Sequence, residues 1–138
     1  ERRRPLFEAA EAQGTLDDPL TLMRIVFQPV FDEIDGQGRH SIASFLRAVN
    51  RYPQWDGRAG IEKLAPIAHR VYAILRQQVS HLPQQLFDAR LRLINEICYG
   101  AITDQDDNPP ADGPDAVLAR KMFDDALRAC VHLIFLDQ

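Results

Sequence analysis

Apolar residues recur at three- and four-residue intervals in two long segments near the end of the sequence, residues 83–103 and 113–136. This spacing predicts two α-helices, each long enough for roughly five to seven turns. Apolar residues cover more than one face of each helix, whereas a surface helix needs only one apolar stripe. We therefore expect these faces to stay partly exposed in one protomer and to be covered by a second copy in a four-helix homodimer interface. The residues expected there are Leu86, Leu93, Ile97 and Gly100 on the first helix, and Met122, Ala126, Leu127, Cys130, Val131 and Ile134 on the second.

The preceding part of the sequence also has helical spacing throughout. Its predicted helices cover about residues 2–13, 19–35, 40–50 and 59–80. Gly14 is a typical helix stop and Pro19 suits a first helical turn, whereas Pro66 should kink the last of these helices or split off its first turn. Residues 104–114 are acidic, contain three prolines and predict a surface loop. Since no two-residue alternation indicates strands, the sequence predicts an all-α fold, with about six helices in an antiparallel bundle and one domain over residues 1–138.

Composition and charge narrow the class of protein. The net charge of −4 argues against nucleic-acid binding by this segment alone. No apolar run reaches the ~18–20 residues that a membrane span needs, and the charged start is not followed by the apolar segment of a signal peptide. We expect a cytoplasmic protein with no membrane partner, in which Cys98 and Cys130 are buried free thiols.

Three segments carry a resemblance to a known family. They are RAVNRYP at residues 47–53, LAPIAHRVY at residues 64–72 and HLPQQLFDARLR at residues 81–92. Together with the order of the helices, they resemble the C-terminal ligand-binding and dimerisation domain of the TetR (tetracycline-repressor-like) transcription regulators. Members of that family begin with a helix-turn-helix DNA-binding head, to which nothing in this sequence corresponds. Residues 1–13 resemble the end of the connector helix between head and body, so we expect this chain to be part of a longer regulator.

The resemblance implies a sensor. It implies a homodimer, a small apolar or amphipathic effector bound inside each body, no cofactor, and DNA binding only through the missing head. Effector binding would move the connector helix and change the spacing of the two heads, which would release a repressor from DNA.

Residues on the second to fifth predicted helices are the candidates for the effector pocket, because ligand cavities are mostly apolar with a few polar groups that orient the ligand. The same residues at helical spacing are also typical of a plain core. His69 and Tyr72 lie one turn apart and could share one ligand oxygen. We expect Trp55 to anchor a turn, and Asn95 to bond a partner chain rather than a ligand. The candidates are Met23, Phe27, Phe31, Phe45, Val49, His69, Tyr72, Leu75, Ile94 and Tyr99, with Phe27, Phe31, Phe45, Tyr72 and Tyr99 bounding the cavity.

The sequence offers little for catalysis. Its histidines show no Glu-x-x-His or other paired metal-ligand spacing. It has no nucleophile elbow, phosphate-binding loop or dinucleotide fingerprint. We therefore expect neither a catalytic nor a metal site. Two alternatives to the sensor stay open: an all-helical dimeric scaffold without a ligand, and a small helical enzyme. A cavity enclosed by the second to fifth helices would favour the sensor over the scaffold.

Overall fold

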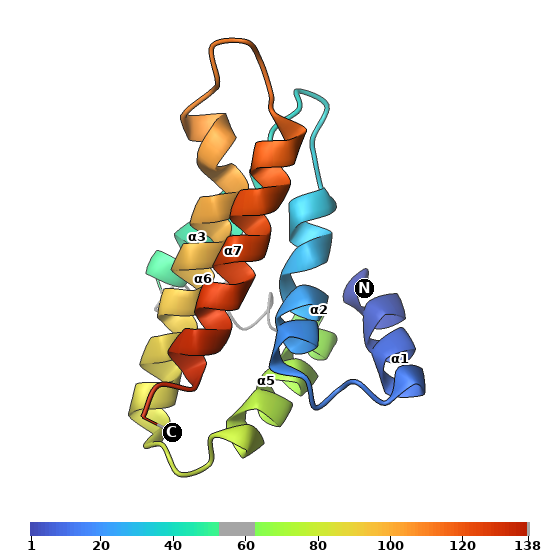
Figure 1. Ribbon diagram of the computed structural model, residues 1–138, viewed down its shortest axis with the longest axis vertical. Coiled ribbons are helices and arrows are strands. Elements are labelled where there is room, and N and C mark those ends of the chain that lie inside the picture. The colour runs from blue at the N-terminus through green and yellow to red at the C-terminus, as the bar shows by residue number, and fades with distance from the viewer. Residues whose placement is uncertain (53–62, 138) are drawn as a thin grey trace.

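Six α-helices make up the computed structural model, which describes residues 1–52 and 63–137 (Figure 1). Within these ranges the chain has no strand, and the prediction of an all-α fold is confirmed. No helix in the described ranges is both long and apolar enough to cross a membrane. Trp55 and the predicted start of a helix at residue 59 lie outside the described residues. The helices are α1 (Arg3–Gln13), α2 (Pro19–Asp32), α3 (Ser41–Arg51), α5 (Pro66–Gln78), α6 (Gln84–Asp107) and α7 (Ala116–Ile134).

The junction between α1 and α2 follows from local chemistry. Gly14 adopts the left-handed conformation, with φ of 71°, and its N–H donates to the carbonyl groups of Ala10 and Glu11. Glycine is the residue that enters this conformation without a steric penalty, so α1 ends there. The Asp18 carboxylate then accepts hydrogen bonds from the N–H groups of Leu20 and Thr21, both at 3.3 Å. With Pro19 in the first turn, this is a complete start signal for α2.

One helix boundary was predicted too far out, whereas the expected break at Pro66 is present. α2 ends at Asp32 rather than near residue 35, because the Asp35 carboxylate accepts hydrogen bonds from the backbone N–H groups of Gln37 and Arg39, at 2.8 and 3.0 Å. These bonds fold the chain into a turn that competes with the helix. α5 begins at Pro66, and Ala65 before it has φ of −125° and ψ of 54°. The residue before a proline is pushed out of the helical region, so Pro66 separates α5 from the helical residues at 63–64.

α6 is longer than predicted. It continues to Asp107, through the residues expected to start a surface loop. The Asp106 carboxylate accepts a hydrogen bond of 2.8 Å from the backbone N–H of His40 and lies 3.2 Å from the Nδ1 atom of the same residue. This contact with the start of α3 gives the last turn of α6 a tertiary partner that the local sequence does not show. The helix stops at Asn108, directly before Pro109.

The long axis of the fold is the hairpin of α6 and α7, which run antiparallel side by side (Figure 1). α3 packs on α6, α2 packs on both α7 and α5, and α1 packs on α2 and α5. Where α2 meets α7, the rings of Phe31 and Phe123 stack with their centroids 4.4 Å apart. Where α6 meets α7, the Sγ atoms of Cys98 and Cys130 are 3.5 Å apart. Two sides of α7 are therefore covered by its own protomer.

This packing corrects four of the ten predicted interface residues. Ala126, Leu127, Cys130 and Ile134 are all buried within a single protomer, so they have no surface to offer a second copy. The apolar surface around α7 was predicted to contact a partner chain, but α2 and α6 of the same protomer cover most of it. Helical periodicity indicates which side of a helix is apolar, but it does not indicate which neighbour covers that side.

The remaining interface residues divide into three kinds. Gly100 is half-buried, with the guanidinium of Arg47 on α3 3.9 Å from where a Cβ atom would lie, and its place in the interface stays a prediction. Val131 is half-buried and packs against the core. The other four predicted interface residues are exposed, namely Leu86, Leu93 and Ile97 on α6 and Met122 on α7.

Candidate ligand-binding cleft

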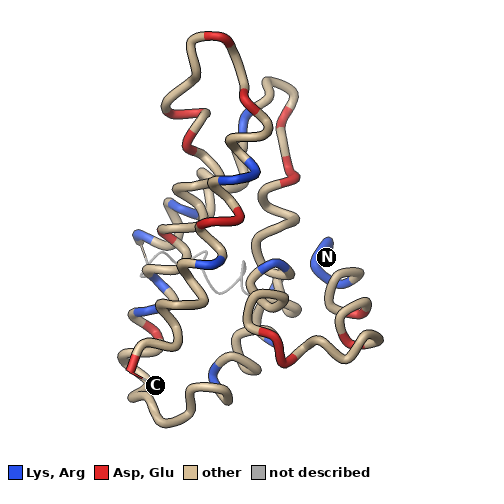
Figure 2. Tube along the Cα trace, viewed as in Figure 1, with Lys and Arg blue, Asp and Glu red and all other residues tan. Residues whose placement is uncertain are grey.

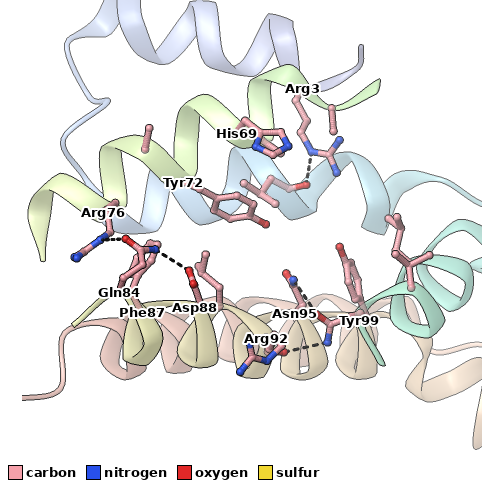
Figure 3. A pocket seen from close by; sticks show the side chains of 18 residues that line it. Arg3, His69, Tyr72, Arg76, Gln84, Phe87, Asp88, Arg92, Asn95 and Tyr99 are labelled. Carbon is pink, nitrogen blue, oxygen red and sulfur yellow. Dashed lines mark hydrogen bonds between the residues drawn. The ribbon is translucent and has the colours of Figure 1, made fainter. Parts of the chain in front are cut away.

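A cleft of about 570 Å³ lies between α5 and α6 (Figure 3). α3 supplies part of its wall, and one residue each from α1 and α2 completes it. Small-molecule sites in proteins typically enclose about 300–1,000 Å³. The apolar lining residues are Val26, Leu46, Val49, Ala65, Ala68, Ala73, Phe87 and Leu91, and the polar or aromatic ones are Arg3, Asn50, His69, Tyr72, Arg76, Gln84, Asp88, Arg92, Asn95 and Tyr99.

Two tyrosines on different helices contribute to the lining. Tyr72 projects from α5 toward α6, and Tyr99 projects from α6 (Figure 3). The Tyr99 ring packs edge-on against Phe27 of the core, with the centroids 5.6 Å apart. Burial, and to a smaller extent the neighbouring Tyr99, raise the pKa of the Tyr72 phenol. Tyr72 therefore keeps its proton at neutral pH and remains a hydrogen-bond donor toward the cleft.

A chain of side-chain amides crosses from α3 to α6 along one wall. The Nδ2 group of Asn50 donates to the backbone carbonyl of Arg92 at 3.1 Å and to the Glu96 carboxylate at 3.2 Å. The Nδ2 group of Asn95 donates to Asn50 Oδ1 at 3.2 Å. Asn50 is only 7% exposed, so these bonds supply the partners that a buried amide requires.

Arginines hold the Glu96 end of this chain. Arg51 binds the Glu96 carboxylate with two hydrogen bonds, at 3.1 and 3.2 Å, and Arg47 lies 3.6 Å from it. The hydrogen bond from Arg51 is the main reason why the pKa of Glu96 lies below its ordinary value, and Asn50 and Arg47 lower it further. Glu96 is therefore ionised at neutral pH, and its oxygens act only as hydrogen-bond acceptors.

α1 and the residues just before it are attached to α2 and α5. The Arg3 guanidinium donates to the carbonyl of Val26 on α2 at 2.9 Å and pairs with Glu1 at 2.9 Å. The other carboxylate oxygen of Glu1 accepts from the backbone N–H of Ile67, at the start of α5, at 3.0 Å. Further along α1, the Arg70 guanidinium of α5 lies 4.3 Å from the centre of the Phe7 ring. A movement of α5 relative to α2 would therefore be transmitted to α1.

Arg76 has a structural role at the cleft. Its guanidinium donates to Gln84 Oε1 at 2.9 Å and to the carbonyl groups of Val79 and Leu82, both at 2.8 Å. These bonds close the turn between α5 and α6. Since the donors are committed to protein acceptors, Arg76 positions the two walls and has little capacity left for an anion.

Four of the predicted pocket residues line this cleft, namely Val49, His69, Tyr72 and Tyr99. His69 is exposed and lies at the rim. The interpretation of Asn95 as a contact for a partner chain is corrected, because its amide bonds Asn50 of the same protomer and lines the cleft.

The other six predicted pocket residues lie elsewhere. Met23, Phe27, Leu75 and Ile94 are fully buried core residues, which was the alternative interpretation of their spacing. Phe31 stacks between Phe123 and His40. Phe45 is 48% exposed and does not line the cleft. Of the five residues expected to bound the cavity, only Tyr72 and Tyr99 do so.

Sequence reasoning missed the polar wall. Asn50 was not among the predicted site residues. Asn95 was predicted to bond a partner chain, but it bonds Asn50 of the same protomer. The available signal was an uncharged amide inside the apolar repeat of α6, where a polar side chain needs a hydrogen-bond partner. The partner lies 45 positions away, and no local pattern could identify it.

Two further kinds of chemistry can be assessed in the described residues, metal binding and cysteine reactivity. They contain no cluster of three side chains able to hold a metal ion. The hydrogen bond with Cys130, together with burial, raises the pKa of the Cys98 thiol, so this thiol stays protonated and is a poor nucleophile. Comparison with known proteins finds no matching family model, no matching curated protein and no matching solved structure.

Proposed function

We propose that this chain is the ligand-sensing and dimerisation body of a tetracycline-repressor-like transcription regulator, acting in the cytoplasm as a repressor that a small apolar or amphipathic effector releases. The observation that carries the proposal is the cleft between α5 and α6. It has the volume of a small-molecule site, and apolar side chains line it beside polar groups held by hydrogen bonds. A scaffold without a ligand has no need of such a cleft.

The position of α1 supports a signalling role. In the family that the sequence resembles, the helix at this place leads to the DNA-binding head. Here α1 contributes Arg3 to the cleft and bonds to both α2 and α5. A ligand that moves α5 relative to α2 would change the contacts of α1. To shift the protein between its two states, the ligand must bind one of them more tightly by a few kcal/mol.

The exposed apolar face of the α6–α7 hairpin supports the dimer. Leu86, Leu93, Ile97 and Met122 remain uncovered in one protomer. A twofold axis across this face would bury the same residues from both copies. An obligate interface of this kind usually buries more than about 2,000 Å² and is apolar.

The test is ligand-dependent stabilisation that requires the cleft. A thermal-shift screen of phenols, hydrophobic acids and planar aromatics should find compounds that raise the melting temperature. At 100 times Kd, a ligand that binds only the folded state adds about 2.7 kcal/mol of stability. Ala73→Trp places a large side chain on the cleft wall of α5 and should remove the shift.

Gln77→Trp is the matched control, because Gln77 is exposed on the same helix and does not line the cleft. This variant should respond to ligands as the parent chain does. If no compound shifts the melting temperature of the parent chain, or if Ala73→Trp leaves a shift unchanged, the sensing proposal is wrong.

A further inference from the structure

We infer that the cleft binds an amphipathic carboxylate, with the charged end of the ligand held by the Tyr72 hydroxyl and the Arg3 guanidinium and its apolar body against α6. This inference rests on the proposed sensing function and specifies the ligand chemistry of the same site. Both polar groups line the cleft, and both can donate hydrogen bonds.

The Tyr72 hydroxyl is an open hydrogen-bond donor. It is directed from α5 into the cleft (Figure 3), and it makes no hydrogen bond with the described residues. Unlike Asn95 Oδ1, which is shielded from solvent, this hydroxyl is accessible. A ligand in the cleft can therefore reach it, and an acceptor on that ligand gives it a partner.

The Arg3 guanidinium also has open donors. A guanidinium carries five N–H donors, and here Nε donates to the carbonyl of Val26 while Nη1 donates to Glu1. The Nη2 group makes no hydrogen bond with the described residues and is accessible to solvent. Hydrogen bonds from a guanidinium to a carboxylate are charge-assisted and stronger than those between neutral groups. Arg3 can therefore bind an anion without giving up its existing contacts.

The two donors act on the same part of the cleft. Burial and the neighbouring Tyr99 raise the pKa of the Tyr72 phenol, whereas the positive charge of Arg3 lowers it. A charge has such an effect only on a group close to it. A single carboxylate can therefore accept from the Tyr72 hydroxyl with one oxygen and from Arg3 with the other.

The charges along the lining favour an anion over a cation. Asp88 is linked to a positive charge through one amide, because Gln84 donates to Asp88 at 2.8 Å and accepts from Arg76 at 2.9 Å. A cationic ligand would add a further positive charge beside the arginines. The charged lining residues are Arg3, Arg76, Arg92 and Asp88, so the cleft is more basic than the whole chain, whose net charge is −4.

The apolar part of the ligand would lie against the remainder of the lining. Phe87 and Leu91 of α6 and Ala68 of α5 provide apolar surface. Two linked rings with one carboxylate suit both the volume of the cleft and this division of its lining.

Binding at Arg3 also gives the ligand a direct contact with α1. Arg3 is the first residue of that helix. A bound carboxylate would compete with Glu1 for the guanidinium, and Glu1 also accepts from the backbone N–H of Ile67 at the start of α5. The charge of the ligand would thereby act on the contacts that hold α1 to α2 and α5.

The experiment compares three probes of one shape by isothermal titration calorimetry at pH 7: biphenyl-4-carboxylate, biphenyl-4-carboxamide and 4-phenylbenzylamine, which is protonated at this pH. The amide keeps a carbonyl acceptor but has no charge, and the amine carries the opposite charge. We expect the carboxylate to bind about tenfold more tightly than the amide, because its hydrogen bonds are charge-assisted, and the amine to bind most weakly.

Two variants test the assigned residues. Arg3→Gln should reduce the ratio between carboxylate and amide to about one. Arg2→Gln is the matched control, because it removes the same charge from an exposed neighbour that does not line the cleft, and it should preserve the ratio. Tyr72→Phe should weaken binding of the carboxylate about tenfold, since a hydrogen bond to a charged group is lost.

Equal or tighter binding of the amide or the amine by the parent chain overturns this inference and leaves the sensing function in place. An unchanged ratio in Arg3→Gln together with an unchanged carboxylate affinity in Tyr72→Phe does the same. If one of these variants does not fold, the other decides. Absence of binding by all three probes overturns the inference, and the thermal-shift screen then decides the sensing function by itself.

Discussion

Two sides of α6 carry uncovered apolar surface, and they differ in shape and chemistry. On the outer side, Leu93 and Ile97 are 53% and 38% exposed and do not line the cleft. On the inner side, Leu91 and Tyr99 line a cleft together with the oriented amide of Asn95. An open apolar face suits another protein surface, whereas a concave site with fixed polar atoms suits a small molecule.

A third side of α6 packs against α7. Ile94 and Cys98 are completely buried against α7. Arg90, also buried, donates to the carbonyl of Leu136 at 3.0 Å and to the carboxylate of Asp137 at 2.7 Å. These contacts fix the hairpin, so a change on the outer side of α6 should leave the cleft intact. Burial pattern, and not hydrophobicity, separates the roles of the faces of this helix.

The largest expected effect is on the outer side alone. Leu93→Asp should weaken dimerisation at least about 100-fold, because the twofold axis brings a carboxylate into the apolar interface from each copy. Sedimentation velocity at micromolar concentration measures it. Ile34→Asp is the matched control, since Ile34 is 54% exposed but lies outside both helices, and it should remain dimeric. A parent chain that is already monomeric would refute the interface.

The next effect is on the inner side alone. Asn50→Leu removes the donor to the Arg92 carbonyl and the acceptor for Asn95, and it should lower the free energy of unfolding by about 2 kcal/mol. Urea denaturation gives this value. Sedimentation should show that the variant is still a dimer, and Gln77→Leu should change the stability by less than about 0.5 kcal/mol. A loss of dimerisation in Asn50→Leu would show that the two sides are not independent.

A smaller effect, on the cleft side of α6, is expected in the pH dependence of stability. The pKa of Glu96 is lowered in the folded state by Arg51, so its ionised form stabilises the fold above its unfolded pKa of about 4.3. That contribution is lost as the pH falls from this value through the lower folded pKa. Glu96→Gln should therefore lower the stability at pH 7 by up to about 1 kcal/mol and flatten the acid decline below pH ~4.3. Urea midpoints at several pH values measure both changes. An unchanged acid decline would contradict the role of Glu96.

The last prediction is a negative result for DNA binding. Neither side of α6 should give the 138-residue chain specific affinity for duplex DNA, because its net charge is −4. Acidic residues follow one another along the end of α6 and the loop to α7 (Figure 2). Fluorescence anisotropy with labelled duplexes at low salt should show only weak binding that does not depend on sequence. Nanomolar, sequence-selective binding would contradict the proposed role of this chain.

The sequence by itself determined the elements and several of their ends. Helical periodicity predicted the six helices, and Gly14, Pro19 and Pro66 marked boundaries that the structure contains. These signals are local, because a cap or a proline acts on the backbone within a few residues. The exposure of Leu93 and Ile97 was also predictable, since their helix has more apolar positions than one neighbour can cover.

Only the tertiary structure decided which apolar faces are used and where the cleft lies. Whether Leu127 packs against its own protomer or against a second copy depends on the placement of whole helices. The local sequence does not indicate which of the two occurs. The polar wall depends on Asn50 and Asn95, which are 45 positions apart. An amide takes either orientation until its partners are fixed, so the hydrogen bond between these two amides forms only once α3 has docked on α6 beside the ionised Glu96.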